Sequence, residues 1–360
     1  MTVNRFNVKA LLLAGSCLLS CSQGHAAAGS TASHNSTFAA TTTNLPPFSR
    51  RVESQGQFFH VRTMQPAQWQ QDPKQPVLIL LAGPNQNYHA DSAWFALLQP
   101  LLAQHYQVHT IDRLGNAWSD DDEDLSYRRF ADDLARLLPK LSPQPMIIIS
   151  FASASISSQL LYQRHRQQLK LNAMIWLDPD VATAATVALY QGYPVDWYQQ
   201  NLTALLPKLA AGSWQQRTAD KLAAERQQVQ ALVPASYQAL MDWDYFAAVL
   251  AQRQSVARQQ ARAREIAAYA ADLQLYLQQS LIKTIPVTVI DSDFETAEAA
   301  ANPAEQQKLL VFQQQSSAWN RQVATVSGGQ YITTGQSQHL LMLQQPELVL
   351  QAVQALTKPR

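Results

Sequence analysis

Apolar runs of strand length are the feature of this 360-residue sequence that most restricts its fold. The clearest four occupy residues 76–81, 146–149, 173–177 and 285–290. Because these runs are continuous rather than alternating, they indicate strands that are buried on both faces, as in a parallel sheet. Weaker strand signals occur at residues 58–63, 106–111 and 330–333.

Segments with helical spacing separate the strand signals, most clearly at residues 91–104, 132–141 and 156–166. A repeated order of strand, helix and strand implies right-handed crossover connections within one sheet. The sequence therefore predicts an α/β fold built on a mostly parallel, doubly wound sheet.

The stretch from 181 to 283 contains no strand signal and is rich in Ala, Gln and Leu. We interpret it as a helical cap inserted into a core that comprises residues 51–180 and 284–360. The cap carries large aromatic residues that either form its own core or line an apolar cleft above the strand ends: Trp197, Tyr198, Trp214, Trp243 and Tyr245. In the second case the substrate would be apolar and neutral.

The first residues have the pattern of a secretory signal. Arg5 and Lys9 precede an apolar run at 10–19 that is too short to span a bilayer. The residues that end at Cys21 resemble a bacterial lipobox, which implies a signal peptide over 1–21, a lipid on Cys21, and an outer-membrane protein that faces the periplasm. The alternative is ordinary cleavage near residues 26–28. Residues 22–50 lack apolar periodicity and are predicted to form a flexible linker.

Charge and cysteine content argue against a nucleic-acid partner and against sites built from cysteine. The formal net charge is +1, from 27 basic and 26 acidic residues, which argues against nucleic acid as a partner. The two cysteines, Cys17 and Cys21, both lie in the first apolar stretch. The rest of the chain therefore has neither a disulfide framework nor a thiolate metal site, and we expect no cofactor or metal.

Five segments, in order, resemble the α/β-hydrolase family with a helical cap. They are Leu80-Leu81-Ala82-Gly83 with Trp94, the turn at 112–119, the strand and turn at 146–155, the segment 286–295, and Gln336-Ser337-Gln338-His339 followed by Pro346-Glu347. The resemblance implies an α/β-hydrolase fold and a serine, acid and histidine triad that hydrolyses a carbonyl compound.

The nucleophile turn can be aligned in two ways. In one register the tip is Ala152, whose neighbours at 150 and 154 are small, but a methyl group cannot attack a substrate. In the other register Ser153 is the tip and supplies a hydroxyl, although the bulky Phe151 then occupies a position that favours glycine. The first register predicts an inert site, and the second predicts a serine nucleophile.

The oxyanion site departs from the family pattern. One of its two N–H donors normally comes from the residue after the strand-end glycine, which here is Pro84 and has no N–H group. Asn85 is the candidate replacement, together with Ala154, the residue that follows Ser153. Ala82 also stands where relatives have histidine.

The base and the acid follow from position along the chain. His339, in the late loop, is the candidate general base. Counting along the strand at 285–290 gives Glu295 as the acid that orients it, with Asp293 and Asp291 as rivals. Asp178 and Asp180, after the preceding strand, mark the other place where relatives carry the acid.

Two functions remain open from the sequence. The first is a lipid-anchored envelope hydrolase in which Ser153 attacks a small apolar ester, lactone or amide. The second is a non-catalytic relative that keeps the scaffold as a ligand-binding or partner-binding module. Retention of His339 favours the first function, and Ala82, Pro84 and Ala152 favour the second.

Overall fold

The computed structural model describes residues 45–70, 72–335 and 338–358. Cys17 and Cys21 lie outside these residues. Within them the chain forms one sheet of eight strands: β1 (Ser49–Ser54), β2 (Gln57–Met64), β3 (Val77–Leu81), β4 (Val108–Ile111), β5 (Met146–Phe151), β6 (Leu171–Leu177), β7 (Val287–Asp291) and β8 (Tyr331–Thr333).

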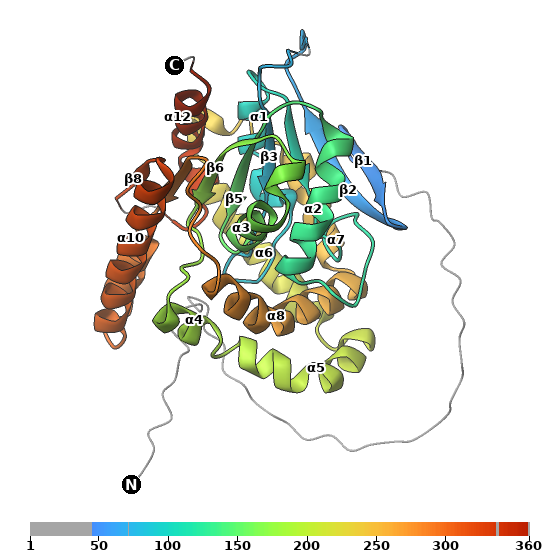
Figure 1. The fold of residues 1–360 in the computed structure, drawn as a ribbon. Helices are drawn as coiled ribbons and strands as arrows, with labels where there is room; N and C mark the ends of the chain where they lie inside the picture. Colours follow the sequence, from blue (N-terminus) through green and yellow to red (C-terminus); the bar gives the residue numbers. More distant parts are fainter. Residues whose placement is uncertain (1–44, 71, 336–337, 359–360) are drawn as a thin grey trace, which may run out of the picture.

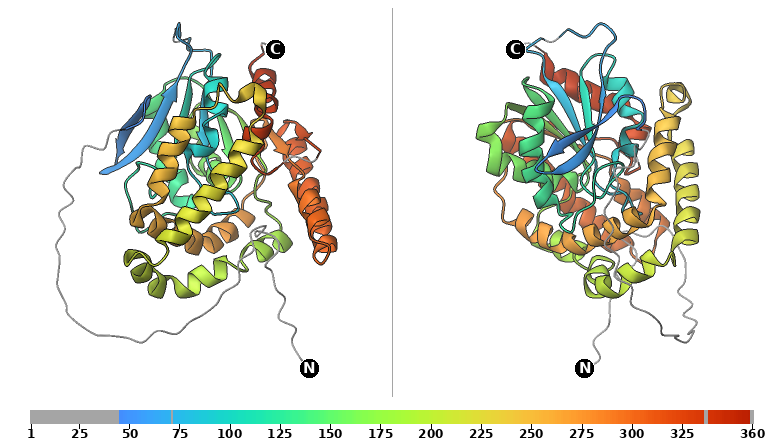
Figure 2. Two further views of the ribbon diagram at one scale, coloured as in Figure 1. Left: turned by 180° about the vertical axis from the view of Figure 1, so that it is seen from behind. Right: turned by 90° about the vertical axis from the view of Figure 1, so that its right-hand side faces the viewer.

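The sheet has the strand order β1-β2-β4-β3-β5-β6-β7-β8. The pairs β1/β2 and β2/β4 are antiparallel, and every later pair is parallel. The β1–β2 hairpin forms one edge of the sheet, and β8 lies with α10 at the opposite edge (Figures 1 and 2). The predicted mostly parallel, doubly wound α/β sheet is confirmed.

Helices connect the strands and cover the sheet: α1 (Leu98–Leu102), α2 (Tyr127–Leu141), α3 (Ala154–His165), α9 (Phe294–Ala301), α10 (Gln306–Ser327), α11 (Leu341–Gln344) and α12 (Pro346–Thr357). Between β6 and β7 the chain forms only helices, which are α4 (Ala184–Tyr190), α5 (Val195–Ala210), α6 (Gln215–Leu232), α7 (Trp243–Arg253), α8 (Val256–Leu277) and the short 3-10 helix at 235–237. Of these, α4, α5 and α8 lie together at one end of the sheet (Figure 1). None of the helices in the described ranges is both long enough and apolar enough to span a bilayer.

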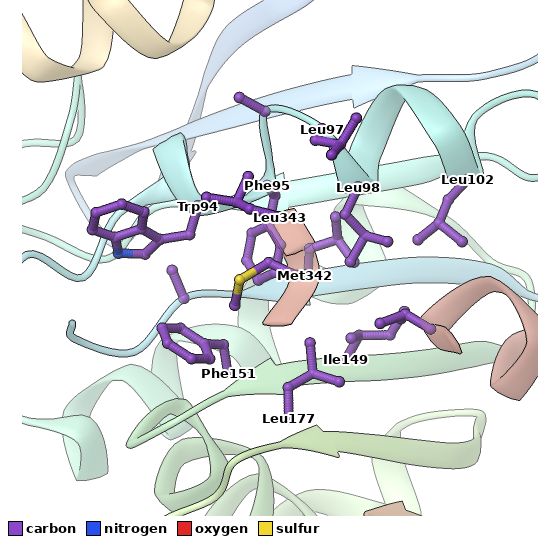
Figure 3. Close-up of a cluster of buried hydrophobic side chains, with 14 of the residues drawn as sticks. Trp94, Phe95, Leu97, Leu98, Leu102, Ile149, Phe151, Leu177, Met342 and Leu343 are labelled. Atoms are coloured by element: carbon purple, nitrogen blue, oxygen red, sulfur yellow. The ribbon is translucent and has the colours of Figure 1, made fainter. Parts of the chain in front are cut away.

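The core lies on both faces of the central strands, which explains their continuous apolar runs. Side chains of β5 alternate between two clusters: Ile149 and Phe151 pack on one face, and Ile148 packs on the other. On the first face, Ile149, Phe151 and Leu177 lie near Met342 and Leu343 of α11 (Figure 3). Packing in this cluster therefore holds the end of β5 against the segment that follows His339.

The structure differs from the sequence predictions at two places. The segment 91–104, expected as one helix, is a 3-10 helix at Ser92–Phe95 followed by the five-residue α1. Residues 49 and 50, expected in the linker, belong to β1, which pairs with β2 from Ser49 opposite Arg62. An edge strand paired on one side needs no continuous apolar run, so composition did not reveal it.

Candidate functional site

The turn between β5 and α3 has Ala152 at its tip. Ala152 has φ +49°, and it is the residue of this turn that adopts the left-handed conformation. Its N–H donates to Leu177 O on the neighbouring strand (2.9 Å), and Phe151 before it remains in the strand with its side chain in the core. A residue at the tip of a strand-to-helix elbow has this strained geometry. The register with Ala152 at the tip is the one that the structure adopts.

Gly83 fixes the elbow against the end of β3. A Cβ atom at residue 83 would lie 2.2 Å from Phe151 O, 2.6 Å from Ser153 N and 2.9 Å from Ala154 N. No side chain fits there without displacing backbone, so the close approach requires glycine. The backbone arrangement of a nucleophile elbow is therefore present, with a methyl group where the attacking atom would be.

Ser153, the predicted nucleophile, lies one residue past the tip and is 2% exposed. Its Oγ donates to Tyr269 Oη (3.3 Å), and Tyr269 in turn donates to Asp180. Of the two registers that the sequence left open, the one with Ser153 at the tip is therefore wrong, because the turn begins only after Phe151 has packed into the core. Tyr269 comes from α8 of the cap, and no motif in the sequence pointed to it.

His339 pairs with Asp178. Its Nδ1 lies 3.1 Å from Asp178 Oδ2, and the side chains are 22% and 3% exposed. Asp178 follows β6 and accepts hydrogen bonds from Ser292 N (2.6 Å) and Ser292 Oγ (2.5 Å). The imidazole ring is flanked by Phe151 and Phe294, each with a centroid distance of 4.7 Å. A buried, doubly held carboxylate orients the ring and leaves Nε2 as the nitrogen available for proton transfer.

The two carboxylates expected to hold His339 have other surroundings. Asp293 has φ +54° before α9, and its oxygens accept from Gln313 Nε2 (3.0 Å) and from Thr333 Oγ1. Glu295 is buried in the first turn of α9 and lines the same cavity as His339, but the partner of the imidazole Nδ1 is Asp178. The acid is therefore at the alternative position after β6, whereas Asp293 and Glu295 lie at the start of α9, beyond the end of β7 at Asp291.

Asn85, the expected oxyanion donor, donates its hydrogen bonds to other groups of the protein. Its backbone N–H donates to His89 O (3.1 Å), and its Nδ2 donates to Glu225 Oε2 (2.6 Å). Burial would raise the pKa of Glu225, but Arg253 and His89 beside it hold the pKa below its ordinary value. Glu225 on α6 is thus an ionised anchor that ties this loop to the cap.

One backbone donor remains at the expected place for an oxyanion. Ser153 N–H follows the tip residue directly, at the start of α3. Ala154, expected in this role, is the first residue of α3 and lies one position too far along. Pro84 cannot donate. With Asn85 engaged, the oxyanion site has one of its two usual donors.

A cavity of about 410 Å³ connects these groups. Its lining includes Ala152, Ser153, Asp178 and His339 from the elbow side, with Tyr269 from the cap. The volume lies within the range of small-molecule sites. The elbow tip and the imidazole therefore face one ligand-sized space.

The five cap aromatics singled out from the sequence do not line this cavity. Tyr198 and Trp214 pack within the cap, Trp243 and Tyr245 join the core, and Trp197 is exposed at the surface. The aromatic residues that do line it are Tyr88, Tyr127, Tyr190, Tyr269, Phe294 and Phe312. An apolar, neutral substrate was expected only if the five cap aromatics lined the cavity, and they do not.

Several carboxyl groups in the cavity have raised pKa values. Burial, together with the nearby Asp178, raises the pKa of Glu295 well above its ordinary value and also raises that of Asp291. Burial raises the pKa of Glu298 to about 7 against an opposing effect of His339. Burial likewise raises the pKa of Asp180. Such clusters of perturbed acids are common in functional sites.

No group of three or more His, Cys, Asp or Glu side chains in the described ranges is arranged to hold a metal ion. The cavity lining also includes Glu265, which is held in an ion pair with Arg113 (2.7 Å). The carboxyl groups are thus spread around the cavity rather than converging on one point.

Comparison with known proteins agrees with the fold and the order of these elements. The model of the alpha/beta hydrolase family matches residues 78–352. A comparison with curated proteins gave no match. An alpha/beta hydrolase fold protein from Burkholderia ambifaria is similar in structure (TM-score 0.54, 18% identity, covering 85% of this chain and 97% of that one). So is the epoxide hydrolase VrEH1 from Vigna radiata (TM-score 0.57, 14% identity, covering 86% and 98%). With the family match spanning most of its length, the chain belongs to the alpha/beta hydrolase family.

Proposed function

We propose that this protein hydrolyses a small ester, lactone or amide with water activated directly by the His339–Asp178 pair, without a covalent intermediate. The observation that carries the proposal is the orientation of His339. Its Nδ1 is bound to a buried carboxylate while the ring faces a ligand-sized cavity whose elbow tip is the methyl group of Ala152. A base with no protein nucleophile beside it acts on water or on the substrate itself.

The reaction follows from these positions. Asp178 accepts the Nδ1–H bond and stabilises the imidazolium that forms. His339 Nε2 removes a proton from water as the water oxygen bonds to the carbonyl carbon. The tetrahedral intermediate places its oxyanion toward Ser153 N–H, then breaks the bond to the leaving group, which takes the proton from His339. The products are a carboxylic acid and an alcohol or amine.

The expected rate is modest. General-base catalysis contributes about 10²- to 10⁴-fold, and the lost oxyanion donor costs about 10²- to 10³-fold. The cavity of about 410 Å³ lies within the range of small-molecule sites and suits a small substrate.

Hydrolysis of p-nitrophenyl butyrate tests this function. We expect slow turnover by the intact protein, a loss of about 10²-fold or more in His339→Ala, and a rate within about twofold of the intact protein in Ser153→Ala, since residue 153 contributes its backbone rather than its hydroxyl. A fluorophosphonate probe, which requires a nucleophilic serine, should not label the protein. Labelling that disappears in Ser153→Ala would instead restore the serine mechanism.

A second function, ligand binding without catalysis, is favoured by the oxyanion site. Pro84 has no N–H group, and both kinds of donor on Asn85 are bound within the protein. The two functions separate in the same assay: equal hydrolysis by the intact protein and by His339→Ala, at the background rate, supports binding alone.

We also propose that the protein is attached by a lipid on Cys21 to the bacterial envelope, at the outer membrane and facing the periplasm. The lipobox-like residues that end at Cys21 support this, and they lie outside the described residues. Metabolic labelling with a radioactive fatty acid tests it. The intact protein should incorporate the label and fractionate with the outer membrane, and Cys21→Ser should do neither.

A further inference from the structure

The end of the cavity formed by α9 and α10 is lined by carboxyl, hydroxyl and amide groups that the proposed reaction does not use. We call the residues Asp291, Glu295, Glu298, Ser316 and Asn320 the α9–α10 subsite; all five line the cavity. Asp291 ends β7, the two glutamates lie on one face of α9, and the other two lie on α10 one helical turn apart. The proposed catalytic groups, by contrast, lie around the elbow.

Acceptor atoms in this subsite are buried without a partner. Ser316 is 5% exposed and Asn320 is 3% exposed, yet Ser316 Oγ and Asn320 Oδ1 have no hydrogen bond within the described residues. Glu298 Oε2 is also buried and unpartnered there. Leaving a buried polar atom unsatisfied costs about 1 to 3 kcal/mol. Three such atoms at one end of a cavity indicate a ligand that satisfies them, and the amide oxygen and the carboxylate need a donor.

The charges favour a cationic donor. His339 is the one basic side chain among the residues found to line the cavity, and its Nδ1 is already paired with Asp178. Arg113 balances Glu265 from outside the lining. Asp291 accepts from Asn320 Nδ2 (3.0 Å) and Tyr331 Oη (2.9 Å), which are neutral. The carboxyl groups of the subsite thus lack a cation in the described structure.

Aromatic rings border the same end of the cavity. Phe294 and Phe312 come from α9 and α10, and Tyr190 packs edge-on against Phe312 with centroids 5.8 Å apart. Aromatic faces attract organic cations and accommodate the carbon atoms attached to an ammonium group. A metal ion carries no carbon chain that could pack on these rings, and the acidic groups of the described residues do not converge as metal ligands do.

We propose that the α9–α10 subsite binds the ammonium group of an organic amine, so that the substrate is an amine-bearing ester or amide. The ammonium donates to the carboxylates of Glu295 and Glu298 and to Asn320 Oδ1, while its carbon chain lies along Phe294 and Phe312. The substrate class rests on the proposed hydrolysis, but binding of the amine does not. The raised pKa values of Glu295 and Glu298 agree with this role, because a bound cation supplies the counter-charge that burial otherwise denies them.

Calorimetric titration at pH 8 with three probes of one shape tests the subsite: benzylammonium, benzyl alcohol and benzoate. The intact protein should bind benzylammonium at least about tenfold more tightly than benzyl alcohol, and benzoate most weakly, since charge-assisted hydrogen bonds are about twice as strong as neutral ones. Glu298→Gln and Glu295→Gln should each remove most of the tenfold preference. Glu123→Gln, an exposed glutamate outside the cavity, is the matched control and should retain it.

Equal affinity for benzylammonium and benzyl alcohol, no measurable binding of benzylammonium, or an unchanged preference in both glutamine variants would overturn the inference. Because Glu298 is less buried than Glu295, its variant keeps the test available if Glu295→Gln does not fold. Repeating the titration with His339→Ala separates the two proposals. His339→Ala should lose hydrolysis and keep the amine preference, because the imidazole is not part of the subsite. In the intact protein, amine preference without hydrolysis leaves the subsite standing and removes the proposed reaction, and hydrolysis without amine preference does the reverse.

Discussion

The two sides of the candidate site have departed from the family pattern to different degrees. On the side of β6, β7 and the last loop, His339, Asp178 and Ser292 form a connected chain of hydrogen bonds. On the side of β3 and β5, the tip residue is alanine and a proline removes an oxyanion donor. The base side retains an imidazole paired with a carboxylate, whereas the elbow side retains only the backbone conformation of the turn.

This difference shows that packing can hold an elbow in its strained conformation when the reactive side chain is absent. Ala152 retains the left-handed conformation although it carries no reactive atom. The turn is held by the Ala152 N–H bond to β6, by Phe151 in the core and by the backbone contact with Gly83. Because each of these contacts supports the sheet, the strained turn persists without the hydroxyl that it usually presents.

The largest effect is expected on the base side, from Asp178→Asn. The amide keeps the shape of the carboxylate but cannot stabilise an imidazolium, so hydrolysis of p-nitrophenyl butyrate should fall by about 10²- to 10⁴-fold. The melting temperature should change little, because Ser292 can still donate to the amide oxygen. An unchanged rate would mean that the base side, like the side chain at the elbow tip, takes no part in catalysis.

A second prediction converts the elbow side toward the missing chemistry. Ala152→Ser adds one hydroxyl at the tip, in a conformation that the backbone already holds. We expect labelling by a fluorophosphonate probe and a gain of about 10- to 100-fold in ester hydrolysis, limited by the missing oxyanion donor. Adding Ser153→Ala should leave the labelling intact. No labelling of Ala152→Ser would indicate that the tip does not face His339.

Also on the elbow side, Gly83→Ala should act on stability. The added methyl group meets backbone atoms of residues 151, 153 and 154, so we expect a loss of about 2 to 3 kcal/mol in the free energy of unfolding, measured by urea denaturation. Gly56→Ala is the control: φ is +78° and no atom lies within 4 Å of the added carbon, so the loss should be only about 1 kcal/mol. Equal losses would show that the elbow is not held by this contact.

The scaffold was more predictable from the sequence than the site. Continuous apolar runs identified the central strands, because a strand buried on both faces must be apolar at every position. The helix at 306–327 gave no clear signal, since its buried residues are interrupted by a polar face of glutamines and serines. Because the fold class depends on such runs, its prediction remains correct even where individual helices are missed.

The sequence left the site undecided where one residue of register decides the chemistry. Ser153 and Ala152 are adjacent, and tertiary contacts, among them the packing of Phe151 and the close approach of Gly83, determine which one occupies the tip. Counting along the strand at 285–290 gave Glu295 although the end of the strand was placed within one residue, because sequence does not reveal that His339 packs against Asp178 after β6. The unpaired atoms of Ser316 and Asn320 become visible only when α10 is placed against the cavity.

The smallest effect concerns the pH dependence of stability, measured with Glu298→Gln. Burial raises the pKa of Glu298 from 4.5 to about 7 in the folded protein. The folded state therefore binds more protons between these values, so the contribution of Glu298 to stability is complete below pH 4.5 and is lost as the pH rises through about 7. Each tenfold difference in proton affinity between the folded and unfolded states corresponds to about 1.4 kcal/mol, and partial exposure of the side chain reduces this value.

The loss of stability from pH 4.5 to pH 8 should therefore be about 1 to 2 kcal/mol smaller in Glu298→Gln than in the intact protein. Urea denaturation at the two pH values measures it, with Glu123→Gln as the control; equal losses in Glu298→Gln and the intact protein would contradict it. Saturating benzylammonium should reduce the pH dependence of the intact protein, because a cation beside Glu298 favours its charged form.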